Sequence, residues 1–311
     1  MIIHLDAPER SDIAFKRFTF PDGQPHIVFD PLVLKQAAGS SAIDLIGRLK
    51  SGNDLLNMAL TLDAIRSVLG DTMPSLTLNI SYLLGARMDR RIASGQPASL
   101  AVIGTLLNSG ILGMARVRVL DPHSPTALAV LPGMETLYPD ALVAFALARI
   151  QRDTGQAPVV VIPDAGAHDR THNILSRLNA PHATARCSKL RDSRTGKLSG
   201  FQLEAGTVAH RIALIVDDIC DGGGTFSGIA QILRANGAEK IYLCVTHGIF
   251  SKGIEIEGID AVFTTDSYAV PDQAGFEIDQ GKELESVRLY KREGKVRLTL
   301  MHDFMESILR N

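Results

Sequence analysis

The sequence predicts an α/β protein of two domains, each built on a mainly parallel sheet flanked by helices. Short apolar runs rich in β-branched residues alternate with longer segments of helical periodicity in both halves of the chain, which is the pattern of repeated strand–helix–strand units. The 311 residues exceed one average domain and suffice for two separate cores. Hydrophobic residues make up 45% and charged residues 21% of the chain, which argues against a disordered polypeptide.

The first domain is expected to span residues 1–137. A helix is predicted over residues 53–69, where apolar side chains recur at helical spacing and Asn53 can cap the first turn. A charged loop over residues 84–91 separates a strand from the next helix. The remaining predicted elements of this half are a strand over 77–83, a helix over 99–108 and a strand over 117–121.

The second domain is expected to span residues 138–297 and to repeat this plan. Its clearest strand is the apolar run 212–216, followed by a helix that Asn236 and Gly237 end. Polar residues 192–199 predict a mobile loop or hairpin, and the tail, residues 298–311, a strand end plus a short helix packed on the first domain. Further strands are predicted over 159–162, 183–187 and 241–245, and a further helix from about 171.

Charge and composition exclude several classes of partner. A net charge of −2 and an aromatic content of 5% without Trp disfavour nucleic-acid binding. No stretch reaches the roughly 18 apolar residues of a membrane helix, and the first residues lack the features of a signal peptide. Cys187, Cys220 and Cys244 are too few and too irregularly spaced for a disulfide framework or a zinc site. We therefore expect a cytoplasmic protein that binds neither nucleic acid nor membrane.

The loop after the strand 212–216 carries the strongest chemical signal. Ligands of parallel α/β sheets bind outside the carboxyl ends of the strands, where this chain places three acids. Three glycines then allow a tight turn whose amides can converge on one anion, helped by a threonine hydroxyl and the dipole of the next helix. A solvated turn that merely needs glycine is the alternative. The predicted phosphate and sugar site consists of Asp217, Asp218, Asp221, Gly222, Gly223, Gly224 and Thr225.

This segment resembles the phosphoribosyl-binding signature of type I phosphoribosyltransferases and of ribose-phosphate pyrophosphokinases, the PRPP synthetases. The resemblance implies two type I phosphoribosyltransferase-like domains, the first on the ATP side and the second on the ribose 5-phosphate side. The signature usually has threonine where this chain has Gly222. One side-chain donor to the 5-phosphate is thus missing, and a backbone amide is expected to replace it.

Two further segments resemble metal-binding parts of PRPP synthetases. Residues 163–166 match a Pro-Asp-Xaa-Gly segment, and residues 121–123, Asp-Pro-His, are similar to an Asp-Leu-His segment. The resemblance implies that Asp164 and His123 hold the Mg²⁺ of Mg·ATP. An acid at a strand end is also a reasonable magnesium ligand on chemical grounds, whereas a lone histidine is more often a surface residue. Arg170 sits where the family has an arginine.

Two segments of the first half resemble the ATP-binding parts of the same family. The loop with Arg87, Asp89 and Arg90 is similar to an Ala-Arg-Gln-Asp-Arg loop, with Met88 in place of Gln. Arginine suits triphosphate oxygens because it can bind them bidentately. In isolation the segment could equally be a charged surface turn.

The segment that contains Phe20, Asp22 and Gln24 resembles a Phe-Xaa-Asp-Gly-Glu hairpin, with Gln24 in place of Glu. In the family this hairpin reaches the ATP site of a neighbouring subunit, where the residue matching Phe20 stacks on adenine. The resemblance thus implies ATP binding and a homo-oligomer, either a dimer or a hexamer.

Lys189-Leu190-Arg191 resembles the Lys-Xaa-Arg of the family's flexible catalytic loop. Two cations on a lid can neutralise the charge that spreads over a transferring phosphoryl group. The alternative is a solvated basic run. Residues 245–251 match a Thr-His-Gly-Xaa-Phe-Ser segment, in which His247 is expected to be structural or near the site.

Taken in order along the chain, these segments imply an Mg²⁺-dependent enzyme that makes PRPP and AMP from ATP and ribose 5-phosphate. An enzyme that consumes PRPP would need only the second half. A catalytically inactive, regulatory PRPP-synthetase-like subunit is the other alternative. The substitutions at Gln24, Met88 and Gly222 keep it open, whereas the retained Lys189, Arg191, His123, Asp164 and three loop acids argue against it.

Overall fold

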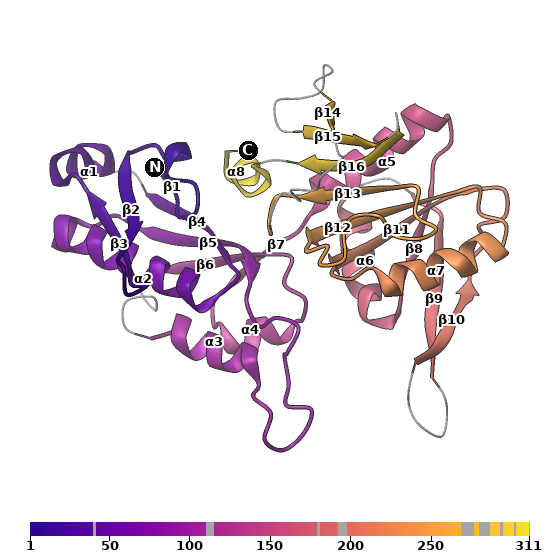
Figure 1. Cartoon of the computed structure of the whole chain (residues 1–311), viewed down its shortest axis with the longest axis horizontal. Helices are drawn as coiled ribbons and strands as arrows, with labels where there is room; N and C mark the ends of the chain where they lie inside the picture. Colours follow the sequence, from indigo (N-terminus) through magenta and orange to yellow (C-terminus); the bar gives the residue numbers. More distant parts are fainter. Residues whose placement is uncertain are drawn as a thin grey trace. The chain divides into compact units, whose positions relative to one another are not determined.

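The computed structural model describes residues 1–39, 42–109, 115–178, 181–191, 198–268, 277–279, 287–292, 295–301 and 303–310. The chain divides into two compact units (Figure 1). The first comprises Met1–Leu137 and Met305–Asn311, and the second comprises Tyr138–Phe304. The predicted fold class is confirmed, since each unit has a mainly parallel sheet flanked by helices. In the part described, no helix combines the length and the apolar character that crossing a membrane requires.

The first unit contains a sheet of five parallel strands and a separate antiparallel pair. Helix α2 (Gly52–Leu69) packs on this sheet through Met58, Leu62 and Ile65, which are buried. The sheet has the order β1 (Ile2–His4), β4 (Ile43–Leu49), β5 (Leu76–Leu83), β6 (Arg116–Leu120) and β7 (Glu135–Leu137). The antiparallel pair is β2 (Phe15–Thr19) with β3 (Pro25–Phe29). The other elements are α1 (Pro31–Ala38), α3 (Ser99–Leu107), α4 (Thr126–Val130), η1 (Pro8–Arg10) and η2 (Gly70–Thr72).

Helix α2 begins earlier than predicted. Ser51, not Asn53, is the N-cap, and its Oγ accepts a hydrogen bond from the Asp54 amide at 3.3 Å. The Asp54 carboxylate in turn accepts from Ser51 Oγ at 2.8 Å and from the Lys50 amide at 3.0 Å. This reciprocal arrangement satisfies amides that would otherwise lack partners at the helix start, which is why the cap lies two residues before the predicted one.

Helices α3 and α4 approach each other closely at Gly104. A Cβ placed on Gly104 would lie 2.7 Å from Val130 O and 2.9 Å from Val130 Cβ. Gly104→Ala is expected to lower the free energy of unfolding by about 1–3 kcal/mol, because the two helices must move apart. Gly52→Ala, where the added methyl group would meet nothing within 4 Å, is the control and should change it by less than about 1 kcal/mol. Urea denaturation compares the two variants, and equal midpoints would contradict the close approach.

The described strands of the second unit form one nine-stranded sheet. Its six central strands, which are β9, β8, β11, β12, β13 and β16, run parallel to one another. In spatial order the strands are β10 (Leu198–Ala205), β9 (Thr184–Arg191), β8 (Val159–Ile162), β11 (Ile212–Cys220), β12 (Lys240–Gly248), β13 (Ala261–Thr265), β16 (Lys295–Met301), β15 (Val287–Arg292) and β14 (Glu277–Asp279). The other elements of this unit are α5 (Asp140–Thr154), η4 (Ala165–Ala167), α6 (His168–Arg177) and α7 (Gly224–Ala235), whereas α8 (Phe304–Arg310) belongs to the first unit except for Phe304.

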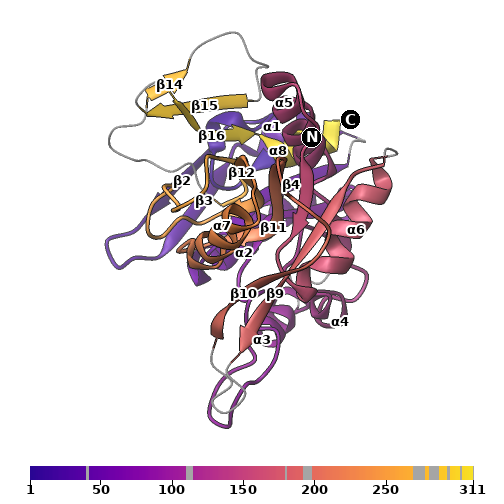
Figure 2. The same ribbon diagram turned by 90° about the vertical axis from the view of Figure 1, so that its right-hand side faces the viewer.

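Helices cover both faces of this sheet. Figure 2 shows α7 on one side and α5 and α6 on the other. Strand residues with alternate side-chain directions supply the two faces. Ile215 and Leu243 share a core cluster with Ile229 of α7, whereas the ring of Phe263 lies 6.3 Å from that of Phe145 on α5. Because both faces are covered, the strands read as continuous apolar runs.

The chain's tail divides between the units. The sequence predicts that residues 298–311 join the first domain, but β16 instead pairs in parallel with β13, with Val262 opposite Leu298. The residues Met305–Asn311 group with the first unit, where the Glu306 carboxylate lies 3.1 Å from Arg10 Nη2 and 3.0 Å from His4 Nε2. The sequence predicts the strand end but not its partner, because β13 is distant in the chain.

Candidate active site

The predicted site of the second unit lies at one edge of its sheet. Strands β9, β8, β11 and β12 are parallel neighbours, so their carboxyl ends meet at the same edge. The predicted Asp164 segment follows β8, and the acid- and glycine-rich turn follows β11. The loop 249–253 follows β12 at this edge. This is where parallel α/β sheets bind ligands.

The turn after β11 has the backbone geometry of an anion site. Gly223 has a φ of 76°, in the left-handed region that favours glycine, and precedes the first residue of α7. A Cβ on Gly223 would also lie 2.9 Å from Ile256 Cγ1. By contrast, a Cβ on Gly224 would meet nothing within 4 Å, so the space above the start of α7 is open. The start of α7, with the positive end of the helix dipole, suits a phosphate group.

Two adjacent carboxylates lie near the carboxyl end of β11. Asp218 is buried, and its amide donates to Asp217 Oδ1 at 2.9 Å. Burial raises the pKa of Asp217 well above its usual range, the charge of Asp218 raises it further, and the charge of Arg170 opposes both effects. A ligand that brings a cation or hydroxyl donors to this pair would therefore be favoured electrostatically.

Arg170 connects α6 to β12, the strand beside β11. Its Nη2 donates to Thr246 Oγ1 at 3.2 Å, and Thr246 is fully buried in β12. Helix α6 begins at His168, three residues before its predicted start, because η4 leads directly into it. The earlier start places Arg170 within the first turn of the helix and not before it.

Lys189 contacts Asp164 directly. Lys189 Nζ lies 2.5 Å from Asp164 Oδ2, while Asp164 Oδ1 accepts from the Ala167 amide at 3.1 Å. The sequence predicts Lys189 on a loop, but β9 continues to Arg191 because it pairs with β10, with Phe201 opposite Lys189. The side chain of Arg191 and all of residues 192–197 lie outside the described part of the chain. The predicted transfer lysine and the predicted metal ligand are thus neighbours.

In the first unit, one hydrogen bond joins two predicted ATP-binding segments. Ser124 Oγ donates to Asp89 Oδ2 at 2.7 Å, and Ser124 is buried. The two loops follow the adjacent parallel strands β5 and β6, so their meeting is a consequence of the sheet. Arg87, Arg90 and His123 are exposed around this contact. Exposed cations beside a fixed carboxylate suit a polyphosphate with its metal ion.

Comparison with known proteins agrees with this arrangement. The Phosphoribosyl synthetase-associated domain family matches residues 198–274. The ribose-phosphate pyrophosphokinase of Mycoplasmopsis pulmonis is 26% identical over 84% of this chain and 74% of its own length, and that of Pyrococcus furiosus is 28% identical over 81% and 85%. The Cereibacter sphaeroides enzyme is 30% identical, but the match spans 65% of this chain and 57% of the relative.

A solved structure shares the whole architecture. The phosphoribosylpyrophosphate synthetase of Mycobacterium smegmatis superposes with a TM-score of 0.71 over 100% of this chain and 99% of its own, at 18% sequence identity. This chain is similar to PRPP synthetases in sequence and shares their fold. Like that PRPP synthetase, this chain has an α/β fold with two mainly parallel sheets flanked by helices.

Aromatic rings cluster in the hairpin β2–β3 of this PRPP synthetase relative. The rings of Phe18 and Phe20 lie 5.1 Å apart edge to face, and that of His26 lies 5.5 Å from Phe20. Asp22 Oδ1 accepts from the Gln24 amide at 3.0 Å, so this acid shapes the turn. Phe20 is 42% exposed, which leaves ring surface available for stacking.

The residues of the second unit suit Mg²⁺ only together with substrate. Among the described residues, no three His, Cys, Asp or Glu side chains group to hold a metal. Mg²⁺ prefers oxygen ligands and commonly keeps waters while bound by one or two carboxylates plus substrate phosphates. Asp164 fits that role, although a metal at Oδ2 would have to displace Lys189. His123 belongs to the first unit and Asp164 to the second.

The sequence prediction misses contacts that shape the turn. Ser251 Oγ donates to Asp221 Oδ1 at 2.5 Å, and the amides of Ile249 and Phe250 donate to Cys220 O at 2.9 and 3.1 Å. The sequence could have indicated Ser251, since this residue ends the segment that resembles the family's Thr-His-Gly-Xaa-Phe-Ser. His247 is buried, and its Nδ1 lies 2.8 Å from Ser267 Oγ, which indicates a structural role.

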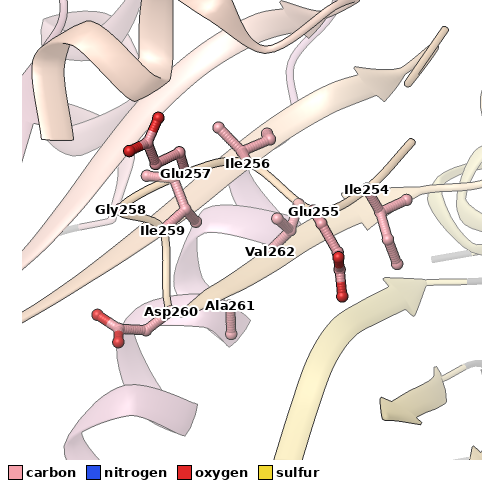
Figure 3. Close-up of a pocket in the computed structure, with 9 residues that line it drawn as sticks. All are labelled: Ile254, Glu255, Ile256, Glu257, Gly258, Ile259, Asp260, Ala261 and Val262. Atoms are coloured by element: carbon pink, nitrogen blue, oxygen red, sulfur yellow. The ribbon is translucent and has the colours of Figure 1, made fainter. Parts of the chain in front are cut away.

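A cavity of about 400 Å³ lies along the segment Ile254–Val262 (Figure 3). None of the predicted site residues lines it. Glu255 and Glu257 point in different directions (Figure 3), so they do not converge on one cation. Asp260 accepts from Arg234 Nη2 at 2.5 Å and from the Ile241 amide at 2.7 Å. The cavity therefore borders the back of the turn, through Ile256, and does not form its phosphate face.

Proposed function

We propose that this protein is a ribose-phosphate diphosphokinase, which transfers the β,γ-pyrophosphoryl group of Mg·ATP to the C1 hydroxyl of ribose 5-phosphate. The hydrogen bond between Ser124 and Asp89 carries this proposal. It joins the two segments of the first unit that resemble ATP-binding parts, and an enzyme that only consumes PRPP would not need them. The proposed enzyme acts in the cytoplasm as a homo-oligomer, a dimer or a hexamer.

The residues of the second unit hold and orient ribose 5-phosphate in this proposal. The amides of Gly222, Gly223 and Gly224, with the Thr225 hydroxyl, bind the 5-phosphate. The carboxylates of Asp217, Asp218 and Asp221 accept hydrogen bonds from the ribose hydroxyls. This reaction depends on in-line positioning and on charge stabilisation more than on a strong base.

The nucleotide is positioned by residues from the predicted ATP segments. Arg87, Asp89 and Arg90 bind and orient the triphosphate, and Phe20, with Asp22 and Gln24 in its hairpin, packs on the base. His123 and Asp164 would each serve as ligands of Mg²⁺, which would supply positive charge to the phosphates. Oxygen O1 of the sugar attacks the β-phosphorus, the bond from this phosphorus to the AMP oxygen breaks, and the hydroxyl proton is lost. Lys189 and Arg191 stabilise the charge of the transition state.

A coupled assay of AMP release tests the proposal. We expect AMP and PRPP to form from ATP and ribose 5-phosphate, and a panel of nucleoside triphosphates to reveal how far Gln24 and Met88 relax the choice of base. Consumption of PRPP with a free base, without AMP release from ATP, would instead identify a phosphoribosyltransferase.

An inactive, regulatory relative is the second candidate. The matched family over residues 198–274 is described as synthetase-associated, and Gln24, Met88 and Gly222 depart from the catalytic pattern. Metal-dependent nucleotide binding without any turnover would favour this candidate over the enzyme.

A further inference from the structure

The side chain of Lys252 lies over the turn that is proposed to bind the 5-phosphate. A Cβ placed on Gly222 would be 3.3 Å from Lys252 Cδ and 3.4 Å from Cε. The ammonium group is one bond beyond Cε, and the lysine side chain is exposed. The space beside Gly222 that a larger side chain would fill is therefore occupied by the stem of a lysine.

The loop that carries Lys252 is fixed to the turn by three hydrogen bonds from the residues that precede Lys252, and a fourth bond closes the loop on itself. Cys220 O accepts from the amides of Ile249 and Phe250, Ser251 Oγ donates to Asp221 Oδ1 at 2.5 Å, and the Gly253 amide donates to Phe250 O at 2.8 Å. Phe250 is buried with a φ of 49°. This strained backbone persists because the surrounding contacts hold it. Lys252 is thus presented to the turn by a preorganised loop.

From this geometry we infer that Lys252 is a phosphate ligand of the turn and takes the place of the side-chain donor missing at Gly222. Lysine binds phosphate oxygens as a point charge, and charge-assisted hydrogen bonds are the stronger ones. The inference adds a side-chain donor to the backbone amide that is expected to bind there. It rests on the proposed function, since it assigns a further residue to the same phosphate site.

Two variants test the charge of Lys252. Lys252→Met keeps the stem over Gly222 and removes the charge, and its Kd for ribose 5-phosphate should rise about tenfold, the effect of losing one hydrogen bond to a charged group. Lys252→Arg should retain most of the affinity. Lys240→Met, with the same charge change at the opposite end of β12, is the control and should bind like the wild type. Isothermal titration calorimetry without nucleotide measures all three, with inorganic phosphate as a second probe.

A reciprocal exchange tests the contact itself. Gly222→Thr alone should weaken binding, because its Cβ meets the Lys252 stem. In a Lys252→Gly background the same threonine has space and should strengthen binding, since it restores a hydroxyl donor. A change of sign between the two backgrounds is the expected result, and equal effects of Gly222→Thr in both would overturn the inference.

The outcomes separate this inference from the proposed function. Wild-type affinity of Lys252→Met for both ribose 5-phosphate and phosphate would overturn the role of Lys252 and leave the proposed reaction intact. If the wild-type protein bound neither compound, the phosphate site and the role of Lys252 would both be wrong. Binding without AMP release would contradict the proposed reaction while the role of Lys252 stood.

Discussion

Lys189→Ala is expected to lower kcat by about 10²- to 10³-fold, the loss typical when one preorganised donor to a transition state is removed, and to change the KM for either substrate only a few-fold. The reason is that Lys189 is held near the transfer site by Asp164, at 2.5 Å, and acts on charge that develops in the reaction. Arg191→Ala should behave in the same way. Steady-state rates of AMP release measure both parameters.

A matched control lies on the same strand. Arg186 pairs with Glu204, with Nε and Oε2 3.1 Å apart and both side chains partly exposed. Arg186→Ala removes one cation from the same hairpin without touching Asp164, so it should retain near-normal kcat. If Lys189→Ala and Arg191→Ala also kept near-normal kcat, the assignment of these residues to catalysis would be wrong.

Removal of divalent metal is expected to abolish turnover. The triphosphate of ATP carries several negative charges, and the site adds the carboxylates of Asp164, Asp217 and Asp218. Without a divalent cation, these charges repel the nucleotide and leave the transferring group unneutralised. We expect no AMP release in excess chelator and full recovery when Mg²⁺ or Mn²⁺ is added back. A chelator already saturated with Mg²⁺ is the control, and full activity in metal-free buffer would refute the proposed mechanism.

The sequence predicted the class of fold well because the parallel strands are buried on both faces. The run at residues 159–162 is apolar throughout, and β8 has the same limits. Such a run is recognisable without knowledge of its partners. The turn at residues 221–225 is recognisable for a similar reason, since its acid and its glycines are local features of the sequence.

The limits of polar strands could not be predicted in this way. The run 212–216 predicts a strand that stops before the acids, yet β11 continues to Cys220 because Ile219 pairs with His247 of β12. Lys189 likewise belongs to a strand through its pairing with Phe201. Polar residues in a strand are stabilised by neighbours from distant parts of the sequence. The hydropathy of the strand's own residues therefore does not predict where such a strand ends.

Site residues contributed by a neighbouring loop are missed for a similar reason. Ser251 and Lys252 follow a different strand from Asp221 and Gly222, and only the parallel pairing of β11 with β12 brings them together. The resemblance pointed to the segment that ends at Ser251. That segment does not include Lys252.

The two hydrogen bonds accepted by Cys220 O have a consequence for protein engineering. They make the turn after β11 and the loop after β12 a single module. A transplant of residues 221–225 alone into another sheet would leave behind the amides that orient Cys220, the hydroxyl that fixes Asp221 and the lysine that covers Gly222. A designer who wishes to move this proposed phosphate site must therefore carry both loops, together with the two adjacent strands that set their register.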